Sequence, residues 1–300
     1  MIRKIYLSDH NQVLADIEDS FEIVDDWMDA DAVVVWQDVR GELVNIVAQS
    51  NLMGIPTFVM QHGLRASREY LPEYGKELLS QRIMVWGPQD KVRMIKSGVE
   101  PERIVVTGTT ILDHLKPKQK HAGINVLFVP LHWDKEIEEN YEVANILNQI
   151  KDIRVLTKLV DGQRIENYKN VILSNRDDKN HLDKITNILK DIDVLVSLSE
   201  STMEFMAYYL DIPVVVVNNW RPKKFLDYEV LNINKDISNA CEVTDINSLE
   251  KVLKNVIENP GKKSKERILA LKLEMGVGFD NKTAKQRIVE TIKSVDQDLD

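Results

Sequence analysis

The segment VSLSESTMEFMAYYLDIPVVVV, residues 196–217, contains the pattern that decides the fold. An apolar run ends in a stretch rich in hydroxyl groups, a helix-like stretch follows, and a proline then opens a run of four valines. Short, continuously apolar runs are typical of strands buried on both faces, and a helix between two of them is typical of a parallel crossover. The segment therefore predicts a strand–helix–strand unit of a parallel sheet.

The same alternation extends through the whole chain. Strands are expected at 4–7, 21–24, 32–36, 56–60, 82–86, 103–107, 125–132, 154–160, 170–174, 194–199, 213–217 and 230–234. Helices are expected at 41–54, 88–99, 135–150, 179–191, 201–211, 245–259 and 282–297. Gly54 and Gly98 suit the left-handed caps that end two of these helices. The pattern predicts an α/β protein with open parallel sheets.

The length of 300 residues suits two domains better than one, since domains typically hold about 100–150 residues. The stretch KPKQKHAG, residues 116–123, is charged and poor in apolar side chains, as expected of a linker. We therefore predict a Rossmann-like domain at 1–115, a second at 124–280, and a final helix at 281–300 that could cross back to the first domain.

Composition excludes several classes of protein. No apolar run reaches the roughly 18 residues that a membrane span needs, and the first residues lack a secretory core. The single cysteine, Cys241, cannot form an internal disulfide, which fits a reducing, cytoplasmic location. The net charge of −9 disfavours nonspecific binding to nucleic acid, although 116–121 and 221–224 are locally basic.

The hydroxyl groups after the strand at 194–199 suggest a phosphate site. Ligands of open α/β sheets bind beyond the carboxyl ends of strands, where helices begin. Ser199, Ser201 and Thr202 would lie beside unpaired amide groups at the positive end of a helix dipole, and Glu204 could accept the hydroxyls of a ribose. The alternative is a capping box formed by Ser201 and Glu204, and the two roles can coexist.

Seven short motifs carry a resemblance to a known superfamily. They are QHGLRA (61–66), PERIVVTGTTILDHL (101–115), PLHWDKE (130–136), VLTKLVDG (155–162), residues 197–217, NNWRPKK (218–224) and FDNKTAKQRI (279–288). In this order the chain resembles GT-B nucleotide-sugar enzymes, in particular the non-hydrolysing UDP-N-acetylglucosamine 2-epimerases and the capsule and teichoic-acid transferases of the CDP-glycerol glycerophosphotransferase type. The resemblance implies two Rossmann-like domains whose parallel sheets face a cleft, with the acceptor on 1–115 and the nucleotide sugar on 124–280.

One departure from the epimerases bears on the reaction. Their glutamate before Gly-Leu-Arg corresponds to Gln61, and an amide cannot serve as the acid or base that epimerisation needs. The resemblance then implies a glycosyltransferase, with His62 as the general base of an inverting displacement, since histidine titrates near neutral pH. A UDP-sugar epimerase or hydrolase, a glycerol- or ribitol-phosphate transferase and a non-catalytic nucleotide-sugar-binding protein remain open.

The remaining candidates follow from the same motifs. We expect His132 to act with His62 in catalysis by holding the diphosphate or the sugar, with an N-cap or turn role as the alternative. We expect Lys158 to contact the donor phosphate, with a surface lysine as the alternative, and Arg221 to clamp a phosphate or carboxylate.

We expect the acceptor side of the cleft to be formed by Gln61, Gly63, Arg65, Gly108 and Thr109. Gly63 and Gly108 would let the backbone approach a ligand. Arg65 could meet an anionic acceptor and Thr109 could donate there, with a solvated loop and ordinary turn bonding as the alternatives.

No Asp-x-Asp motif follows a strand, so a metal-independent reaction without a cofactor is expected. The donor would be linked to UDP or to CMP or CDP. The acceptor would be a glycan, a lipid-linked sugar or, against the charge, a modified nucleic acid.

Overall fold

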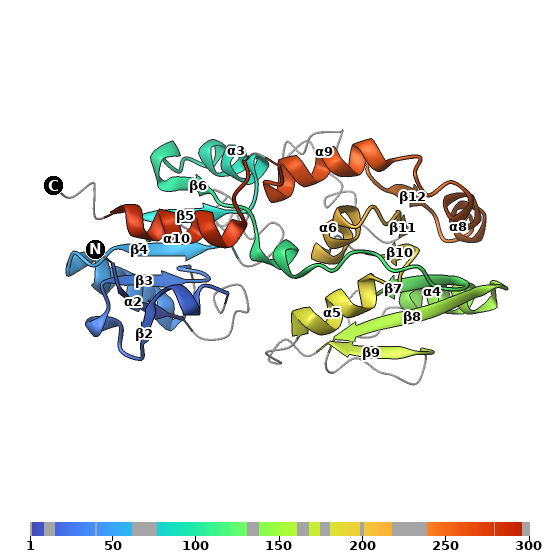
Figure 1. The fold of residues 1–300 in the computed structure, drawn as a ribbon, viewed down its shortest axis with the longest axis horizontal. Helices are drawn as coiled ribbons and strands as arrows, with labels where there is room; N and C mark the ends of the chain where they lie inside the picture. Colours follow the sequence, from blue (N-terminus) through green and yellow to red (C-terminus); the bar gives the residue numbers. More distant parts are fainter. Residues whose placement is uncertain are drawn as a thin grey trace. The chain divides into compact units, whose positions relative to one another are not determined.

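A computed structural model describes residues 2–8, 16–39, 41–61, 77–130, 138–160, 168–174, 181–198, 201–217, 239–278 and 280–295. The chain divides into two compact units, residues 1–113 with 272–300, and residues 114–271. Each unit contains one parallel sheet covered by helices, which confirms the predicted α/β class (Figure 1).

The first unit is built on a sheet with the strand order β2-β1-β3-β4-β5-β6, and its pairs are parallel. The strands are β1 (Lys4–Leu7), β2 (Glu22–Val24), β3 (Ala32–Val35), β4 (Thr57–Met60), β5 (Arg82–Val85) and β6 (Ile104–Val106). The other elements are α2 (Glu42–Leu52), α3 (Pro88–Lys96), α10 (Ala284–Ser294), η1 (Glu18–Ser20), η2 (Trp27–Asp29), η5 (Pro101–Arg103) and η6 (Thr110–His114).

The central strands of this sheet are apolar throughout because both of their faces are covered. Val33, Val35 and Val59 pack with Val47 of α2 and Met94 of α3 in one buried cluster. As predicted, glycines with positive φ follow two helices: Gly54 after α2 has a φ of 73°, and Gly98 after α3 has a φ of 93°. The absence of a Cβ makes this left-handed conformation inexpensive.

The second unit has the strand order β12-β11-β10-β7-β8-β9, again with parallel pairs. The strands are β7 (Ile124–Val129), β8 (Ile153–Val160), β9 (Val171–Ser174), β10 (Val194–Ser197), β11 (Val214–Val217) and β12 (Glu242–Thr244). The helices are α4 (Glu138–Gln149), α5 (His181–Leu189), α6 (Thr202–Tyr209), α8 (Leu249–Glu258) and α9 (Ser264–Met275).

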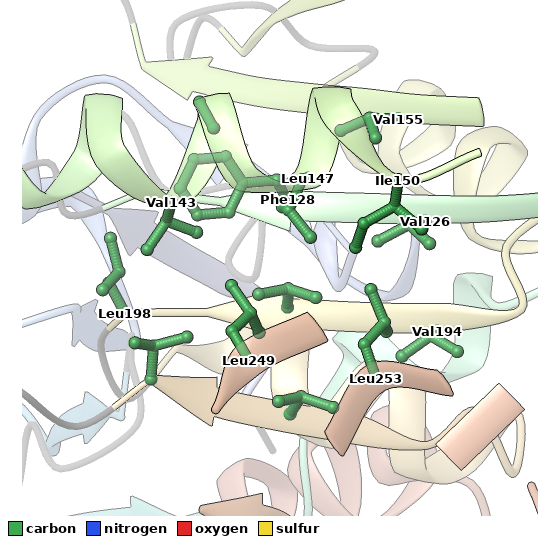
Figure 2. Packing of buried hydrophobic residues seen from close by; sticks show 14 of the residues in the cluster. Val126, Phe128, Val143, Leu147, Ile150, Val155, Val194, Leu198, Leu249 and Leu253 are labelled. Carbon is green, nitrogen blue, oxygen red and sulfur yellow. The ribbon is translucent and has the colours of Figure 1, made fainter. Parts of the chain in front are cut away.

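Helices α4 and α8 cover one face of this second sheet. Figure 2 shows Leu147 of α4 and Leu249 and Leu253 of α8 packed with Phe128 of β7 and Val194 of β10. All of these side chains are buried. The burial of these aliphatic and aromatic groups from two helices and two strands holds the helices on the sheet.

The final helix belongs to the first unit, as the sequence suggested. Thr283 and Gln286 form a capping box at the start of α10. From this helix, Arg287 Nε donates to the Thr107 carbonyl at 2.7 Å, and Ser294 Oγ accepts from Arg82 at 3.4 Å. In Figure 1, α10 accordingly runs alongside β5.

The segment predicted to be a linker, 116–123, forms neither helix nor strand, but it is bonded to the second unit. The Gln119 amide donates to the Lys190 carbonyl at 2.8 Å, and Lys118 pairs with Asp193 at 3.1 Å. The division of the chain falls at 113/114 and at 271/272, whereas the prediction placed its breaks at 115 and 280. The second difference arises because the end of α9 bonds within the first unit.

Two elements were missed by the sequence analysis. Helix α9 and strand β12 were not predicted, and the strand expected at 230–234 lies outside the described residues. In the described part of the chain, no helix is both long and apolar enough to cross a membrane.

Candidate functional site

The second sheet reverses its strand order between β7 and β10. From β7 the chain adds β8 and β9 on one side, then returns to place β10, β11 and β12 on the other. This is the order of the nucleotide-binding Rossmann fold, and it leaves a crevice where neighbouring connections leave the sheet in opposite directions. The carboxyl ends of β7 and β10 are adjacent, with Ser197 opposite Val129 in the register. The crevice therefore lies beyond these two residues.

Helix α6 begins at this crevice. Ser201 is its N-cap, and the Ser201 hydroxyl accepts from the Met203 amide at 3.2 Å. The hydroxyl thus satisfies one of the amide groups that a helix leaves unbonded at its start. The predicted N-cap at Ser201 is confirmed, whereas the capping box with Glu204 stays a prediction. Ser201 and Thr202 are partly exposed, whereas the side chains at 203–208 are all buried.

Glu204 lies in the first turn of α6 and is only 5% exposed. A carboxylate at this position interacts favourably with the positive end of the helix dipole. The helix ends at Leu210, and Asp211 then adopts a φ of 54° before Pro213 leads into β11. Helix α6 has only eight residues, so the connection between β10 and β11 is short.

Lys158 lies near the carboxyl end of β8, paired with Ile172 of β9, and is partly exposed. Because β8 neighbours β7 in a parallel sheet, Lys158 lies at the same edge of the sheet as the start of α6. The structure thus brings Lys158, Ser201, Thr202 and Glu204 to one edge of the second sheet. His132, Ser199 and Arg221, the other predicted donor residues, lie outside the described residues.

In the first unit, His62, Gly63 and Arg65 also lie outside the described residues, whereas Gln61 is the last described residue after β4. Gln61 follows β4 and is 2% exposed. Its side-chain oxygen accepts from the Trp86 amide at 2.9 Å, and its Nε2 donates to Asp90 at 2.9 Å. The Gln61 carbonyl accepts from the Trp86 indole at 2.7 Å. Both ends of the amide are therefore bonded within the protein.

Asp90 connects Gln61 to a buried ion-pair network. Arg93 donates from Nη1 to Asp90 at 2.9 Å, and its two terminal nitrogens bind both oxygens of Glu274 at 2.9 and 2.6 Å. The carboxylates and the guanidinium are nearly completely buried. Burial by itself lowers the pKa of Arg93, but the pairing with Glu274 and Asp90 outweighs burial and raises that pKa above its ordinary value. Arg93 therefore remains charged inside the unit.

Gly108 and Thr109 follow β6 and lie against the C-terminal segment. Gly108 has a φ of 81°, and a Cβ there would lie 2.9 Å from Nη2 of Arg287. Thr109 is buried, and its hydroxyl accepts from the Ile111 amide at 3.3 Å. Tight packing and local turn bonding account for these two residues in the described structure, and their predicted contact with an acceptor stays a prediction.

The sequence analysis did not identify Asp90, Arg93 and Glu274 as a functional group of residues. The spacing of Asp90 and Arg93 by one helical turn was a visible signal. Glu274 was not visible in this way, because it is 181 positions from Arg93. In the described residues, no cluster of three or more His, Cys, Asp or Glu side chains is arranged to hold a metal ion.

Comparison of the whole structure with solved structures shows which fold this is. The chain is similar to the wall teichoic acid polymerase TagF, with a TM-score of 0.62 and 14% identity over 99% of this chain and 90% of that one. It is also similar to UDP-GlcNAc 2-epimerase from Neisseria meningitidis bound to UDP-GlcNAc, with a TM-score of 0.55 and 16% identity over 94% and 79% of the two chains.

A third similar structure is S. aureus MnaA with UDP, with a TM-score of 0.59 and 12% identity over 99% of this chain and 97% of that one. No family model matches the sequence, and no curated protein sequence matches it. The chain therefore has the two-domain, GT-B-like fold of these structures, as the resemblance implied, and at these identities the likeness shows the fold alone.

Proposed function

We propose that this protein is a glycosyltransferase that binds a nucleotide sugar at the carboxyl edge of the second sheet. The observation that carries the proposal is the switch point between β7 and β10, with the capped start of α6 beside it. Helix amide groups, hydroxyls and a cation are the groups that bind phosphate without a metal. Lys158, Ser201 and Thr202 supply the cation and the hydroxyls in this proposal, and the amides of α6 supply the rest.

Structures of the same fold support a nucleotide ligand. The epimerase from Neisseria meningitidis was solved with UDP-GlcNAc, MnaA with UDP, and a variant of the TagF polymerase after soaking with CDPG. All three ligand names denote a nucleotide or a nucleotide conjugate. In our proposal the diphosphate lies at the start of α6, and Glu204 accepts the hydroxyls of the ribose.

The environment of Gln61 favours transfer over epimerisation. Epimerisation at C2 needs a group that removes a proton and one that returns it. Gln61 occupies the position of the epimerase glutamate, and its amide is bonded to Trp86 and Asp90. An amide held in this way neither donates nor accepts a proton in a reaction. We therefore assign Gln61 a structural role in the first unit.

The chemistry of the proposed reaction is a single displacement. His62 removes the proton of an acceptor hydroxyl, and the oxygen attacks the anomeric carbon of the donor. The bond between that carbon and the diphosphate oxygen breaks, and the nucleoside diphosphate leaves with the electron pair. The helix dipole, the hydroxyls and Lys158 then stabilise the charge on the leaving group. In this proposal His132 and Arg221 contact the diphosphate or sugar, Gly63 and Arg65 border the acceptor, and the transfer is inverting.

The first experiment asks whether a nucleotide binds and where. Melting temperatures are measured with UDP, CDP, GDP and CMP, since a ligand of the native state raises them by mass action. We expect one nucleotide to raise the melting temperature of the wild type and to have a weaker effect on Lys158→Met. Lys254→Met is the matched control, because Lys254 is exposed on α8 and pairs with Glu250. If no nucleotide binds at millimolar concentration, the proposal is wrong.

The second experiment identifies the reaction by its leaving group. Glycosyl transfer or hydrolysis of a UDP-sugar releases UDP, whereas glycerophosphate transfer from CDP-glycerol releases CMP. Epimerisation releases no nucleotide but exchanges the C2 hydrogen with heavy water. We expect release of a nucleoside diphosphate without exchange, and loss of this release in His62→Ala with nucleotide binding retained. Release of CMP alone, or exchange at C2, would replace the glycosyltransferase by one of the other two enzymes.

A further inference from the structure

The carboxyl edge of the first sheet is occupied by the protein itself along β4, β5 and β6. The Trp86 side chain follows β5, is 1% exposed and donates to the Gln61 carbonyl after β4. A Cβ at Gly87 would lie 2.6 Å from the Glu274 carbonyl oxygen, and a Cβ at Gly276 would lie 2.6 Å from the Trp86 carbonyl oxygen. Such distances leave no space for a ligand between these backbones.

The cover continues past β6. Arg287 Nε donates to the Thr107 carbonyl at 2.7 Å, and Gly108 packs against the same guanidinium. Residues 273–278 and 280–287 therefore cover the carboxyl ends of β5 and β6 within the first unit. The described residues therefore favour the carboxyl ends of β1 and β3 as the place where a small molecule binds at this edge.

The carboxyl ends of β1 and β3, at the same edge of the sheet, form the switch point of the first sheet. The order β2-β1-β3-β4-β5-β6 reverses between β1 and β3, as in flavodoxin-like folds, whose ligands bind at that point. Leu7 of β1 pairs with Val34 of β3, so the two strands end side by side. The Ser8 hydroxyl accepts from the Trp36 amide at 3.3 Å and joins the two strand ends.

Trp36 differs from Trp86 although both directly follow a strand. Trp86 is buried in the covered half of the edge, whereas Trp36 and Gln37 are partly exposed at the switch point. Asp38, the next residue, is buried and accepts from the amides of Leu79 and Ser80 at 2.9 and 2.6 Å. The chain that carries Trp36 is thus anchored on both sides, by Ser8 and by Asp38.

We propose that the switch point between β1 and β3 is the acceptor-sugar subsite, with Trp36 as the surface on which the sugar ring lies. A pyranose has an apolar face of C–H groups and a rim of hydroxyls. An indole can pack on the face, and the Gln37 amide can bond to the rim. Binding pockets at switch points are lined by aromatic side chains and a few polar groups in this way. The role of this sugar as the acceptor rests on the proposed transferase function, whereas the binding of a sugar at this point does not.

Sugar binding is tested without the reaction. Saturation-transfer NMR with methyl β-glucopyranoside and methyl N-acetyl-β-glucosaminide is recorded on the wild type, Trp36→Ala, Trp36→Phe and Trp27→Phe. Trp27 is the matched control, since it is a partly exposed tryptophan of the same unit that packs on the α2 side of the sheet. We expect the wild type and Trp27→Phe to bind alike, Trp36→Ala to bind about tenfold more weakly, and Trp36→Phe to lie between them.

The outcomes separate this inference from the proposed function. If Trp36→Ala keeps wild-type affinity, or if the wild type binds neither glycoside, the subsite is wrong. If turnover is found, Trp36→Ala should raise the acceptor KM about tenfold, whereas Trp27→Phe should leave it unchanged. If glycosides bind through Trp36 but no nucleotide binds, the transferase function fails and the sugar site stands.

Discussion

The carboxyl edges of the two sheets hold polar residues in different ways. In the first unit, Gln61, Asp90, Arg93 and Glu274 bond to one another in a buried network. In the second unit, Ser201 and Thr202 lie at this edge, at the start of α6, and are partly exposed. Polar groups that satisfy each other stabilise a fold, whereas polar groups at a helix start can exchange water for a ligand. The comparison supports a stabilising role for the first group and agrees with the binding role that we propose for the second.

The largest effect should come from breaking the network of the first unit. Arg93→Met leaves Asp90 and Glu274 buried without their cation, and removal of one partner of a buried pair costs about 3–5 kcal/mol. Urea unfolding should show this loss, and Arg93→Met/Glu274→Leu should recover part of it because the second change removes a stranded charge. Lys254→Met, which breaks an exposed pair with Glu250, should cost about 0–1 kcal/mol. Equal costs for the two single variants would contradict the comparison.

A smaller effect is expected when Gln61 is converted to the epimerase residue. Gln61→Glu removes the donor to Asp90 and places a second buried carboxyl beside it, at a cost of about 1–3 kcal/mol at neutral pH. Burial and the like charge should raise the pKa of one carboxyl in the folded state above its unfolded value. The loss should therefore be smallest in acid and should grow as pH rises through the range between the two values.

Urea unfolding of Gln61→Glu between pH 4 and pH 8 checks this trend, with exposed Gln49→Glu of α2 as the control. A stability deficit that does not change with pH would show that the new carboxyl is not held beside Asp90. The variant should also fail to exchange hydrogen at C2 of a UDP-sugar, since the surrounding residues hold this side chain in place.

The two helix caps allow a direct contrast between the units. Ser201→Ala and Thr283→Ala each remove a cap whose side chain accepts from a helix amide, and each should cost about 1 kcal/mol. Only Ser201→Ala should also weaken nucleotide binding, by about tenfold, because one hydrogen bond to an anion is lost. Ser201→Gly should keep most of the stability yet lose the same affinity, since glycine is a tolerated cap without a hydroxyl. If the two alanine variants bind nucleotide equally well, Ser201 is a cap and nothing more.

The smallest effect at neutral pH should be that of Tyr168→Phe. Burial raises the pKa of Tyr168 to about 12 from an ordinary value of 10.0, and the neighbouring Tyr141 makes a smaller contribution in the same direction. Because the folded pKa is the higher one, this group stabilises the fold fully below pH 10 and loses that contribution as pH rises toward 12. Alkaline titration at the phenolate absorbance should show a late component that is smaller in Tyr168→Phe than in the wild type. A late component of equal size in the two proteins would contradict the assignment.

Much of the architecture could be predicted because strands buried on both faces need continuous apolar runs. The runs at 32–36, 82–86 and 213–217 all correspond to strands. Helix α9 was missed because its apolar residues form no clear stripe. Strand β12 was missed because it has only three residues, and an edge strand of this length depends on its neighbour β11 for its hydrogen bonds.

The candidate site was predictable in part for a related reason. The cap at Ser201 is local, so the spacing of a hydroxyl residue before an apolar helix is enough to indicate it. The hydrogen bonding of the Gln61 side chain is not local, because its partners, Trp86 and Asp90, come after the next strand and from the next helix. The exposure of Trp36 could not be predicted either, since Trp86 follows its strand in the same kind of sequence and is buried.

By itself, the sequence determined the alternation of strands and helices, the presence of two sheets and the hydroxyl-rich start of α6. These features follow from side-chain periodicity and from bonds between near neighbours in the chain. Only the tertiary structure decided that Glu274 neutralises Arg93 and that residues 273–278 and 280–287 cover the carboxyl ends of β5 and β6. The physical reason is that burial and ion pairing depend on which distant residues meet, and that information appears only when the chain is folded.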